Sequence, residues 1–577
     1  MKASRYFPLA TCVLVLLVRP GLAAAPQPYK AMGAPASPHV IAVWNRYHDY
    51  AEATRLLQQL AHAHAGRARL RSLGKSYGGR DMWLLTITSF SQGAEEQKAG
   101  FWIDGGIHAN EIQGSEVALY TAWYLLEMYD LNEQVRRLVD ERVFYILPMM
   151  SPDSRDAHFH QPNTTSSPRA GQRPVDDDRD GLVDEDGPDD LNGDGHITQM
   201  RIRDPHGLWK PHPDYPAAME RVKEGERGQY TLLGYEGIDN DGDGRVNEDG
   251  AGYYDPNRDW GWNWQPSYIQ GGAFRYPFSL LENRAVADFV MAHPNIAGAQ
   301  SYHNAGGMIL RGPGAKTDRF EAEDIRVLDA IGKRGAEMLP GYRYLEVATG
   351  LYEVYGGELD WFYYLRGVLG FTNELFTRFN YFRKSESPPD MVESFDKYLL
   401  LGEGTVPWQE VRHPVYGKVE VGGLKKNWGR QPPSFLLEEE CHRNMAFTLY
   451  HADQMPQVRL QALDVKPLGG GLAQVTAIVE NQRLIPTRAA IDVKNRLTPP
   501  DTVSFAASNA APILGLTSSE PFFQNAREQP RQPACIELAT VPGHGVVYVR
   551  WLVKGQGPFT VAVQSVKGGR HRLAGKL

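Results

Sequence analysis

The stretch Phe101-Trp-Ile-Asp-Gly-Gly-Ile-His-Ala-Asn-Glu111 decides how the first half of the chain folds. Its first four residues are typical of a short buried strand, and the Gly-Gly pair supplies a turn. A long apolar helix is predicted at residues 112–128, and a second strand at residues 142–149. Strands that alternate with helices in this way indicate an α/β domain with a helix-covered sheet.

Composition and apolar periodicity divide the chain into regions. We expect the α/β domain to span residues 38–455. Within it, apolar periodicity fades at about residues 164–252 and Asp, Gly and Pro dominate, which indicates an inserted region of acidic loops. Residues 456–577 alternate apolar and polar side chains in short segments separated by Gly, Pro and Asn. That pattern predicts a C-terminal all-β sandwich domain.

The N-terminus and the composition indicate where the protein works. Lys2 and Arg5 precede an apolar run at residues 7–18, and an Ala-Ala-Ala cleavage site follows, so residues 1–25 predict a signal peptide. We therefore expect a secreted or periplasmic protein, in which Cys441 and Cys535 are free to pair or to remain apart. The run is shorter than the ~20 residues of a membrane span. The net charge of −8 argues against a nucleic-acid partner.

His108 and Glu111 stand three residues apart where the first strand gives way to a helix. At the start of a helix this spacing places both side chains on one face, where they can reach one metal ion. Catalytic zinc commonly takes three protein ligands, and two His with one Glu is such a set. No other of the 17 histidines begins a His-x-x-Glu pattern. Taken alone, the pair is a weak signal, because an ion pair at the helix start explains it as well.

Four later segments carry residues of matching chemistry: Asp255-Pro-Asn-Arg-Asp-Trp260, Gln300-Ser-Tyr-His-Asn304, Tyr352-Glu-Val-Tyr-Gly-Gly-Glu-Leu-Asp-Trp361 and Phe371-Thr-Asn-Glu-Leu375. Together with His108-Ala-Asn-Glu111, they resemble the motifs of the zinc metallocarboxypeptidase family of the pancreatic carboxypeptidases, in the family's order. The resemblance covers about residues 40–450, and the block at residues 352–374 matches without a gap. It implies a carboxypeptidase-like α/β/α fold with a mixed central sheet.

The resemblance also implies the catalytic roles. His108, Glu111 and His303 would bind one catalytic zinc ion. Glu374 would act as the base that takes a proton from the attacking water and passes it to the leaving amine. The expected activity is therefore that of a zinc metallocarboxypeptidase, a peptide hydrolase.

Substrate binding is implied at three further positions. Asn257 and Arg258 would bind the terminal carboxylate of the substrate, and Tyr352 would close over it. Peptide or protein C-termini are therefore the expected partners. Two rival functions stay open, namely a zinc amidohydrolase acting on cell-wall peptides or acylated amino acids, and an inactive calcium-dependent binding or scaffold protein. Retention of Glu374 and of every zinc ligand argues against the second.

Two roles depend on less specific signals. The family uses a second arginine to polarise the scissile carbonyl, and Arg201 and Arg203 share one face of a strand-like segment. We favour Arg201. Leu359 stands where relatives that release basic residues carry an acid, which favours release of apolar or aromatic terminal residues. Glu353 and Glu358 stand close to it in sequence and act against that preference.

Three loops in the acidic insertion share an Asp-x-Asp/Asn-x-Asp-Gly pattern. Alternating oxygen ligands followed by Gly are how calcium loops are built, although the twelfth-position Glu of a helix-loop-helix site is missing. We predict structural calcium that orders the loops near Arg201 and Arg258; the alternative is a set of solvated acidic loops. The candidate ligands are Asp176, Asp178, Asp180, Asp190, Asn192, Asp194, Asp239, Asp241 and Asp243.

Overall fold

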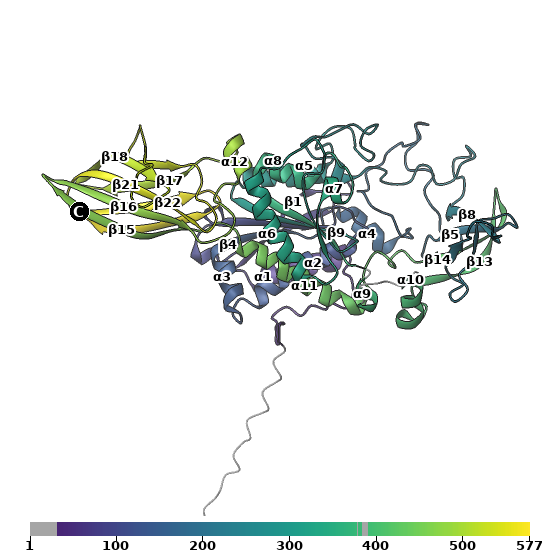
Figure 1. The fold of residues 1–577 in the computed structure, drawn as a ribbon. Coiled ribbons are helices and arrows are strands. Elements are labelled where there is room, and N and C mark those ends of the chain that lie inside the picture. The colour runs from purple at the N-terminus through teal and green to yellow at the C-terminus, as the bar shows by residue number, and fades with distance from the viewer. Residues whose placement is uncertain (1–31, 378, 384–390) are drawn as a thin grey trace, which may run out of the picture.

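The computed structural model describes residues 32–377, 379–383 and 391–577. The predicted signal peptide at residues 1–25 lies outside the described residues. Among the described helices, none is long and apolar enough to cross a membrane. Figure 1 shows a central α/β domain with the C-terminal strands at one end and a second, smaller sheet at the other.

The central domain is built on an eight-stranded mixed sheet in the order β1-β2-β4-β3-β9-β12-β10-β11. The inner strands β4, β3, β9 and β12 are parallel neighbours, whereas β1, β2 and β10 pair antiparallel with at least one neighbour. Strands β3, β4 and β9 are buried along their whole length, as expected for parallel strands covered on both faces. The strands are β1 (Ala68–Lys75), β2 (Asp81–Ile87), β3 (Ala99–Gly105), β4 (Arg142–Leu147), β9 (Ile296–Asn304), β10 (Met308–Arg311), β11 (Arg343–Glu346) and β12 (Leu369–Leu375).

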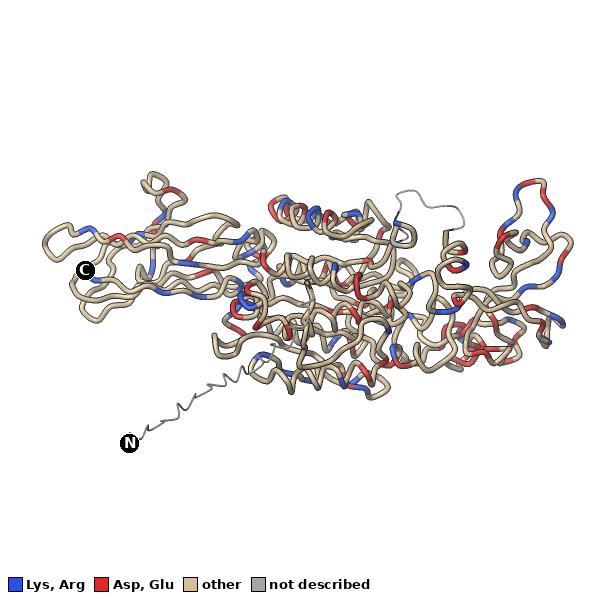
Figure 2. The backbone as a smooth tube through the Cα atoms, turned by 90° about the horizontal axis from the view of Figure 1, so that it is seen from below, with Lys and Arg blue, Asp and Glu red and all other residues tan. Residues whose placement is uncertain are grey.

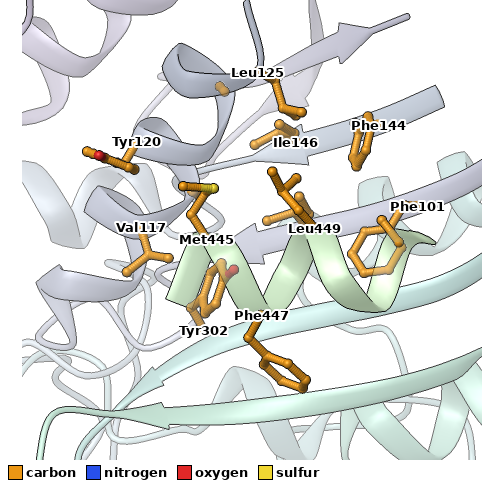
Figure 3. Close-up of a cluster of buried hydrophobic side chains, with 14 of the residues drawn as sticks. Phe101, Val117, Tyr120, Leu125, Phe144, Ile146, Tyr302, Met445, Phe447 and Leu449 are labelled. Atoms are coloured by element: carbon orange, nitrogen blue, oxygen red, sulfur yellow. The ribbon is translucent and has the colours of Figure 1, made fainter. Parts of the chain in front are cut away.

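Helices cover both faces of this sheet, which confirms the predicted α/β/α architecture. The larger core lies under α1 (Tyr50–Ala63), α2 (Ile112–Glu127), α3 (Glu133–Glu141), α6 (Ala322–Met338) and α11 (Ser434–Asp453). Figure 3 shows Met445 and Leu449 of α11 in the same apolar cluster as Val117 of α2 and Ile146 of β4. The opposite core lies under α5 (Leu281–Ala292) and α8 (Glu358–Arg366). The other helical segments are α4 (Pro152–His160), α7 (Val347–Gly350), α9 (Phe379–Phe382), α10 (Met391–Phe395), α12 (Ala490–Asn495), η1 (Phe90–Gln92), η2 (Glu95–Gln97), η3 (Pro256–Arg258) and η4 (Asp396–Leu400).

A second sheet of six strands has the order β13-β14-β5-β8-β6-β7. Four of its strands come from the acidic insertion, which was expected to consist of loops. These four strands have three to six residues and are mostly half-buried, too short to show an alternating pattern in the sequence. The strands are β5 (Gln199–Arg203), β6 (Trp209–Pro211), β7 (Met219–Arg221), β8 (Tyr230–Tyr235), β13 (Thr405–His413) and β14 (Gly417–Leu424).

The C-terminal part is an all-antiparallel β domain, as predicted, in which two sheets share one apolar core. One sheet has the order β15-β16-β21-β18-β19 and the other β20-β17-β22-β23. Cys535 begins β20 and Cys441 is buried in α11; these two described cysteines are not joined to each other by a disulfide. The strands are β15 (Val458–Gly469), β16 (Leu472–Asn481), β17 (Asp501–Ala507), β18 (Ala510–Ser518), β19 (Arg527–Glu528), β20 (Cys535–Leu538), β21 (Gly545–Gly555), β22 (Pro558–Ser565) and β23 (Gly569–Lys576).

Lys567 joins this β domain to the central domain. Its buried ammonium donates to the carbonyl oxygens of Arg366 (2.7 Å) and Gly367 (2.8 Å) at the end of α8. It also pairs with buried Asp492 at 3.2 Å. One side chain thereby satisfies two helix-end carbonyls and a buried carboxylate.

Replacing Lys567 with Met should lower the free energy of unfolding by about 3 kcal/mol, because among the described residues Asp492 then keeps Arg488 alone as a cationic partner. Urea unfolding of the purified chain measures the change. Lys494→Met is the matched control: Lys494 pairs with Glu321 at 2.6 Å across the same boundary but is largely exposed, so its loss should cost less than about 1 kcal/mol. Equal unfolding midpoints for the two variants would contradict the assignment.

Candidate active site

The three predicted zinc ligands come together at the carboxyl ends of the parallel strands. Nδ1 of His108 lies 3.1 Å from Nδ1 of His303 and 3.1 Å from Oε1 of Glu111. Oε2 of Glu111 lies 2.9 Å from Nδ1 of His303. All three side chains are buried. Open α/β sheets bind their ligands at this edge.

The turn before α2 brings His108 and Glu111 together. Both residues precede α2 instead of lying in its first turn as expected, so a turn rather than helical spacing brings them together, and the N–H of Glu111 donates to the carbonyl of His108 at 3.2 Å. Gly105 is required at the end of β3, because a Cβ there would lie 2.7 Å from the carbonyl of Gly114 in α2. Gly106 has a φ of +70°, which favours glycine.

The donor set fits zinc. A tetrahedral ion with bonds of ~2.0–2.1 Å holds its ligand atoms about 3.3 Å apart, close to the 2.9–3.1 Å measured here. Nε2 of His108 lies 2.9 Å from Oδ1 of Asp255, which fixes the ring so that Nδ1 faces the cluster. Burial raises the pKa of Glu111, but His108 and His303 outweigh it and hold that pKa well below its usual value.

Glu374 reaches the same place from the neighbouring strand. Strands β12 and β9 are parallel, and their register puts Glu374 beside His303. Burial and the negative charge of Glu111 raise the pKa of Glu374 to about 7. A carboxyl group with a pKa near neutrality can both accept and return a proton, as a general base must.

The predicted substrate-binding residues line one cavity with His108, His303 and Glu374. Oδ1 of Asn257 accepts the N–H of Glu358 at 2.9 Å. Arg258 is buried and donates to the carbonyl of Asn257 at 2.7 Å. Tyr352 is half exposed, and Leu359 packs in the apolar wall. The structure therefore gathers all four predicted residues around the zinc cluster.

Arg201 does not reach this cavity, contrary to expectation. Its guanidinium pairs with Glu420 of β14 at 2.6 Å and lies over the rings of Tyr230 and Trp408, all in the second sheet. Arg203 is exposed and points to the same Glu420 at 3.5 Å. The match of Arg201 to the family's second arginine failed because the insertion folds into a sheet of its own, away from β9 and β12 (Figure 1).

Arg169 lies at the cluster and was not singled out from the sequence. Nη1 lies 3.0 Å from Oε1 of Glu111, and Nη2 lies 3.2 Å from Oδ2 of Asp255. It lines a cavity that also contains Tyr352 and Glu374. Arg430 lines that cavity too, and its Nη1 lies 3.4 Å from Oε1 of Glu111. Each is a single arginine in a loop without a motif, so no sequence pattern indicated either residue.

The three acidic loops share one local conformation. In each, the N–H of the glycine donates to the first aspartate, at 3.2 Å to Asp176, 2.7 Å to Asp190 and 3.0 Å to Asp239. In the second loop, the other oxygen of Asp190 accepts the N–H of Asp194, and Asp194 is exposed. Asn192 donates to Asp194 at 2.9 Å. In the third loop, Asp243 accepts the N–H of Arg245 at 2.7 Å.

A mixed α/β/α sheet with a buried His-Glu-His cluster and a glutamate beside it defines a metal-dependent hydrolase. Residues 53–180 and 234–395 match the family model described as zinc carboxypeptidase, which is half of the chain. The chain belongs to this family, and zinc is the metal that the family implies for the cluster. Residues 457–575 match a model described only as a domain of unknown function.

Curated relatives match a short segment. Human carboxypeptidase Z is 34% identical over 108 residues, which is 18% of this chain and 17% of that protein. Zinc carboxypeptidase of Saccharothrix mutabilis subsp. capreolus is 33% identical over 107 residues, or 18% of this chain and 24% of the relative. The match thus spans a quarter or less of these relatives.

Solved structures align more widely at lower identity. Thrombin activatable fibrinolysis inhibitor is 16% identical, with a TM-score of 0.43 over 71% of this chain and 74% of that one. Carboxypeptidase A from Helicoverpa armigera is 20% identical, with a TM-score of 0.39 over 57% of this chain and 65% of that one.

Proposed function

We propose that the protein is an exported zinc carboxypeptidase that hydrolyses the C-terminal peptide bond of peptides or proteins. The observation that carries this proposal is the shared cavity: Arg258, a carboxylate-binding side chain, faces the same space as the His-Glu-His cluster and Glu374. An enzyme that binds the terminal carboxylate beside its reacting centre is restricted to the last residue of its substrate.

Each step of peptide hydrolysis can be assigned to a side chain at the cluster. Zinc held by His108, Glu111 and His303 would polarise the scissile carbonyl and lower the pKa of water. Glu374 takes a proton from the attacking water and delivers it to the leaving amine, for which its pKa of about 7 is suited. Arg169, beside Glu111, donates to the oxyanion that develops on the carbonyl.

Binding of the substrate falls to the opposite wall. Arg258 offers two parallel hydrogen bonds to a terminal carboxylate, and Asp255, 4.0 Å from its Nη2, helps to orient it. The amide nitrogen of Asn257 supplies a further donor. Tyr352 is exposed enough to move over the bound residue and exclude water.

The pocket for the terminal side chain combines apolar walls with two buried carboxyl groups. Leu310, Val354 and Leu359 form part of the wall. Glu358 and Asp360 also line it, and each has one oxygen without a hydrogen-bond partner. Burial raises the pKa of Asp360 to about 7, and burial with the charge of Asp104 raises the pKa of Glu358 well above its usual value. Neutral carboxyl groups are compatible with an apolar or aromatic terminal residue, which we therefore propose as preferred.

The preference should depend on pH through Asp360. Its raised pKa of about 7 leaves it mostly neutral at pH 6 and mostly ionised at pH 8. Since the neutral fraction falls about tenfold over that interval, the ratio of kcat/KM for peptides ending in Phe to those ending in Arg should fall by up to about tenfold. Titration of Glu374 affects both substrates and cancels in the ratio. Asp360→Asn should keep the ratio constant; a ratio that favours Arg at pH 6 would reject the apolar preference.

Metal analysis combined with chromatography of the released residues tests the function itself. We expect one zinc ion per chain and stepwise release of single C-terminal amino acids from mixed peptides. His303→Ala should lose both the zinc and the release. A zinc-loaded protein that leaves plain peptides intact but cleaves cell-wall fragments would reject the proposal in favour of the amidohydrolase alternative.

A further inference from the structure

Residues 176–186 and 239–249 repeat the pattern Asp-x-Asp-x-Asp-Gly-x-Val-Asp/Asn-Glu-Asp. The repeat extends to the backbone, since Gly181 and Gly244 have φ values of +100° and +97°, and Asp184 and Asn247 have φ values of 52° and 65°. The acidic residues of this region gather in loops beside the second sheet (Figure 2). Two loops with the same sequence pattern and the same glycine and Asp/Asn backbone conformation indicate that one structural motif occurs twice.

The two loops are joined at their last residues. The N–H of Asp186 donates to the carbonyl of Asp249 at 3.1 Å, and the N–H of Asp249 donates back at 3.2 Å. This reciprocal bridge turns each terminal carboxylate toward the other loop. Ligand oxygens of Asp249 lie within 4.8 Å of those of Asp176 and Asp178, which belong to the first loop.

Asp186, the last residue of the first loop, likewise lies near carboxylates of the other loop. Ligand oxygens of Asp186, from the first loop, lie within 4.8 Å of those of Asp241 and Glu248 in the other loop. Oxygens that share one calcium ion at 2.3–2.6 Å lie at most about 5 Å apart. Both clusters therefore have the spacing of a cation-binding site.

Carboxylates at both clusters lack partners among the described residues, although Asp186 accepts the side-chain N–H of Asn240 at 3.1 Å and the backbone N–H of Asn247 at 3.2 Å. Asp249 is fully buried, and neither of its oxygens accepts a hydrogen bond from the residues that the structure describes. Both oxygens of Glu248, and one of Glu185 at the equivalent position, are also buried without a partner. Burying an unpaired carboxylate is costly, so such groups pair with a cation or bind a metal. A cation bound in each cluster would supply the positive charge that these buried carboxylates lack.

We propose that these two loops bind a pair of calcium ions, each site being completed by the last aspartate of the other loop. All the ligands are hard carboxylate oxygens, which excludes a preference for a softer metal. Crowded, flexible carboxylates suit the six to eight ligands of calcium better than the strict octahedron of magnesium. The loop at residues 190–195 stays outside the proposal, because it lacks the Val-Asp/Asn-Glu-Asp extension that supplies the last aspartate of the other two loops.

The two calcium sites lie in the chain between the active-site arginines Arg169 and Arg258. The first loop follows Arg169 in sequence, and the other loop leads into Asp255 and Arg258. Between them, the hydroxyl oxygen of Tyr254 accepts the N–H of Arg173 at 3.1 Å. The ions therefore fasten the segment that carries one active-site arginine to the segment that carries the other. This replaces the expectation that calcium orders Arg201.

Equilibrium dialysis of the full-length chain against radioactive calcium tests the proposal, with calcium first removed by EGTA in a zinc-buffered solution. We expect two calcium ions per chain at millimolar calcium and none in the double variant Asp186→Asn/Asp249→Asn. Asp194→Asn, in the second loop, is the matched control and should still bind two. Any stoichiometry other than two, or two ions retained by the double variant, would overturn the proposal.

A second readout guards against a variant that fails to fold. Calcium added to the wild-type chain should raise its melting temperature by about 5 °C and leave the zinc content unchanged. An unchanged melting temperature would count against the proposal. The role at the active site rests on the proposed function, and the two separate cleanly: a chain that binds two calcium ions but cleaves no peptide keeps the calcium sites and loses the function.

Discussion

Replacing Glu374 with Gln should lower kcat by about 10²–10⁴-fold, the usual contribution of a general base, while one zinc ion per chain is retained. The amide keeps the shape of the side chain but cannot accept the proton of the attacking water. Its position beside His303 is fixed by strand register rather than by the metal, so the cluster itself should survive. Single-turnover rates together with metal analysis measure both effects.

A matched variant tests whether any buried glutamate would behave in this way. Burial raises the pKa of Glu440 in α11 to about 7, as it does for Glu374, but Glu440 lies beside Tyr342 and away from the cluster. Glu440→Gln should therefore keep the wild-type kcat. If Glu374→Gln also loses zinc, Glu374 holds the metal instead of acting as the base; if it keeps full activity, the base is another group.

The pair His108 and Glu111 was predictable from local spacing, whereas His303 and Glu374 were predicted through the resemblance to the zinc metallocarboxypeptidase motifs. His108 and Glu111 are three residues apart in one turn. His303 and Glu374 end neighbouring parallel strands, and such ends meet at one edge of a sheet. The ungapped block at residues 352–374 then placed Tyr352 and Leu359 in the same cavity.

The second sheet and the pairing of the calcium loops were not predictable, since both depend on contacts between distant segments. Strand β5 pairs with β14, and the register joins Arg201 to Glu420, 219 residues away. Asp186 pairs with Asp249 through backbone hydrogen bonds, which no side-chain pattern in the sequence predicts. The repeated acidic sequence showed that the loops are alike, but not that each completes the other.

Arg169 of the active site was also not predictable from the sequence. Its replacement is expected to cause the second large loss of activity. Arg169→Gln should lower kcat by about 10²–10³-fold, the usual loss when one donor to a developing oxyanion is removed. KM should change less, because Arg258 and Asn257 still bind the terminal carboxylate. Steady-state kinetics with one peptide separates the two constants.

Two further variants decide whether Arg169 is the arginine that acts on the carbonyl. Arg201→Gln loses its bond to Glu420 and should destabilise the second sheet, yet its folded fraction should turn over at the wild-type rate. Arg430→Gln, also near Glu111, should cost less than Arg169→Gln because its contact is longer, 3.4 Å against 3.0 Å. A larger loss in Arg430→Gln with zinc intact would transfer the role to Arg430, and a larger loss in Arg201→Gln would mean that the second sheet closes over the cavity when substrate binds.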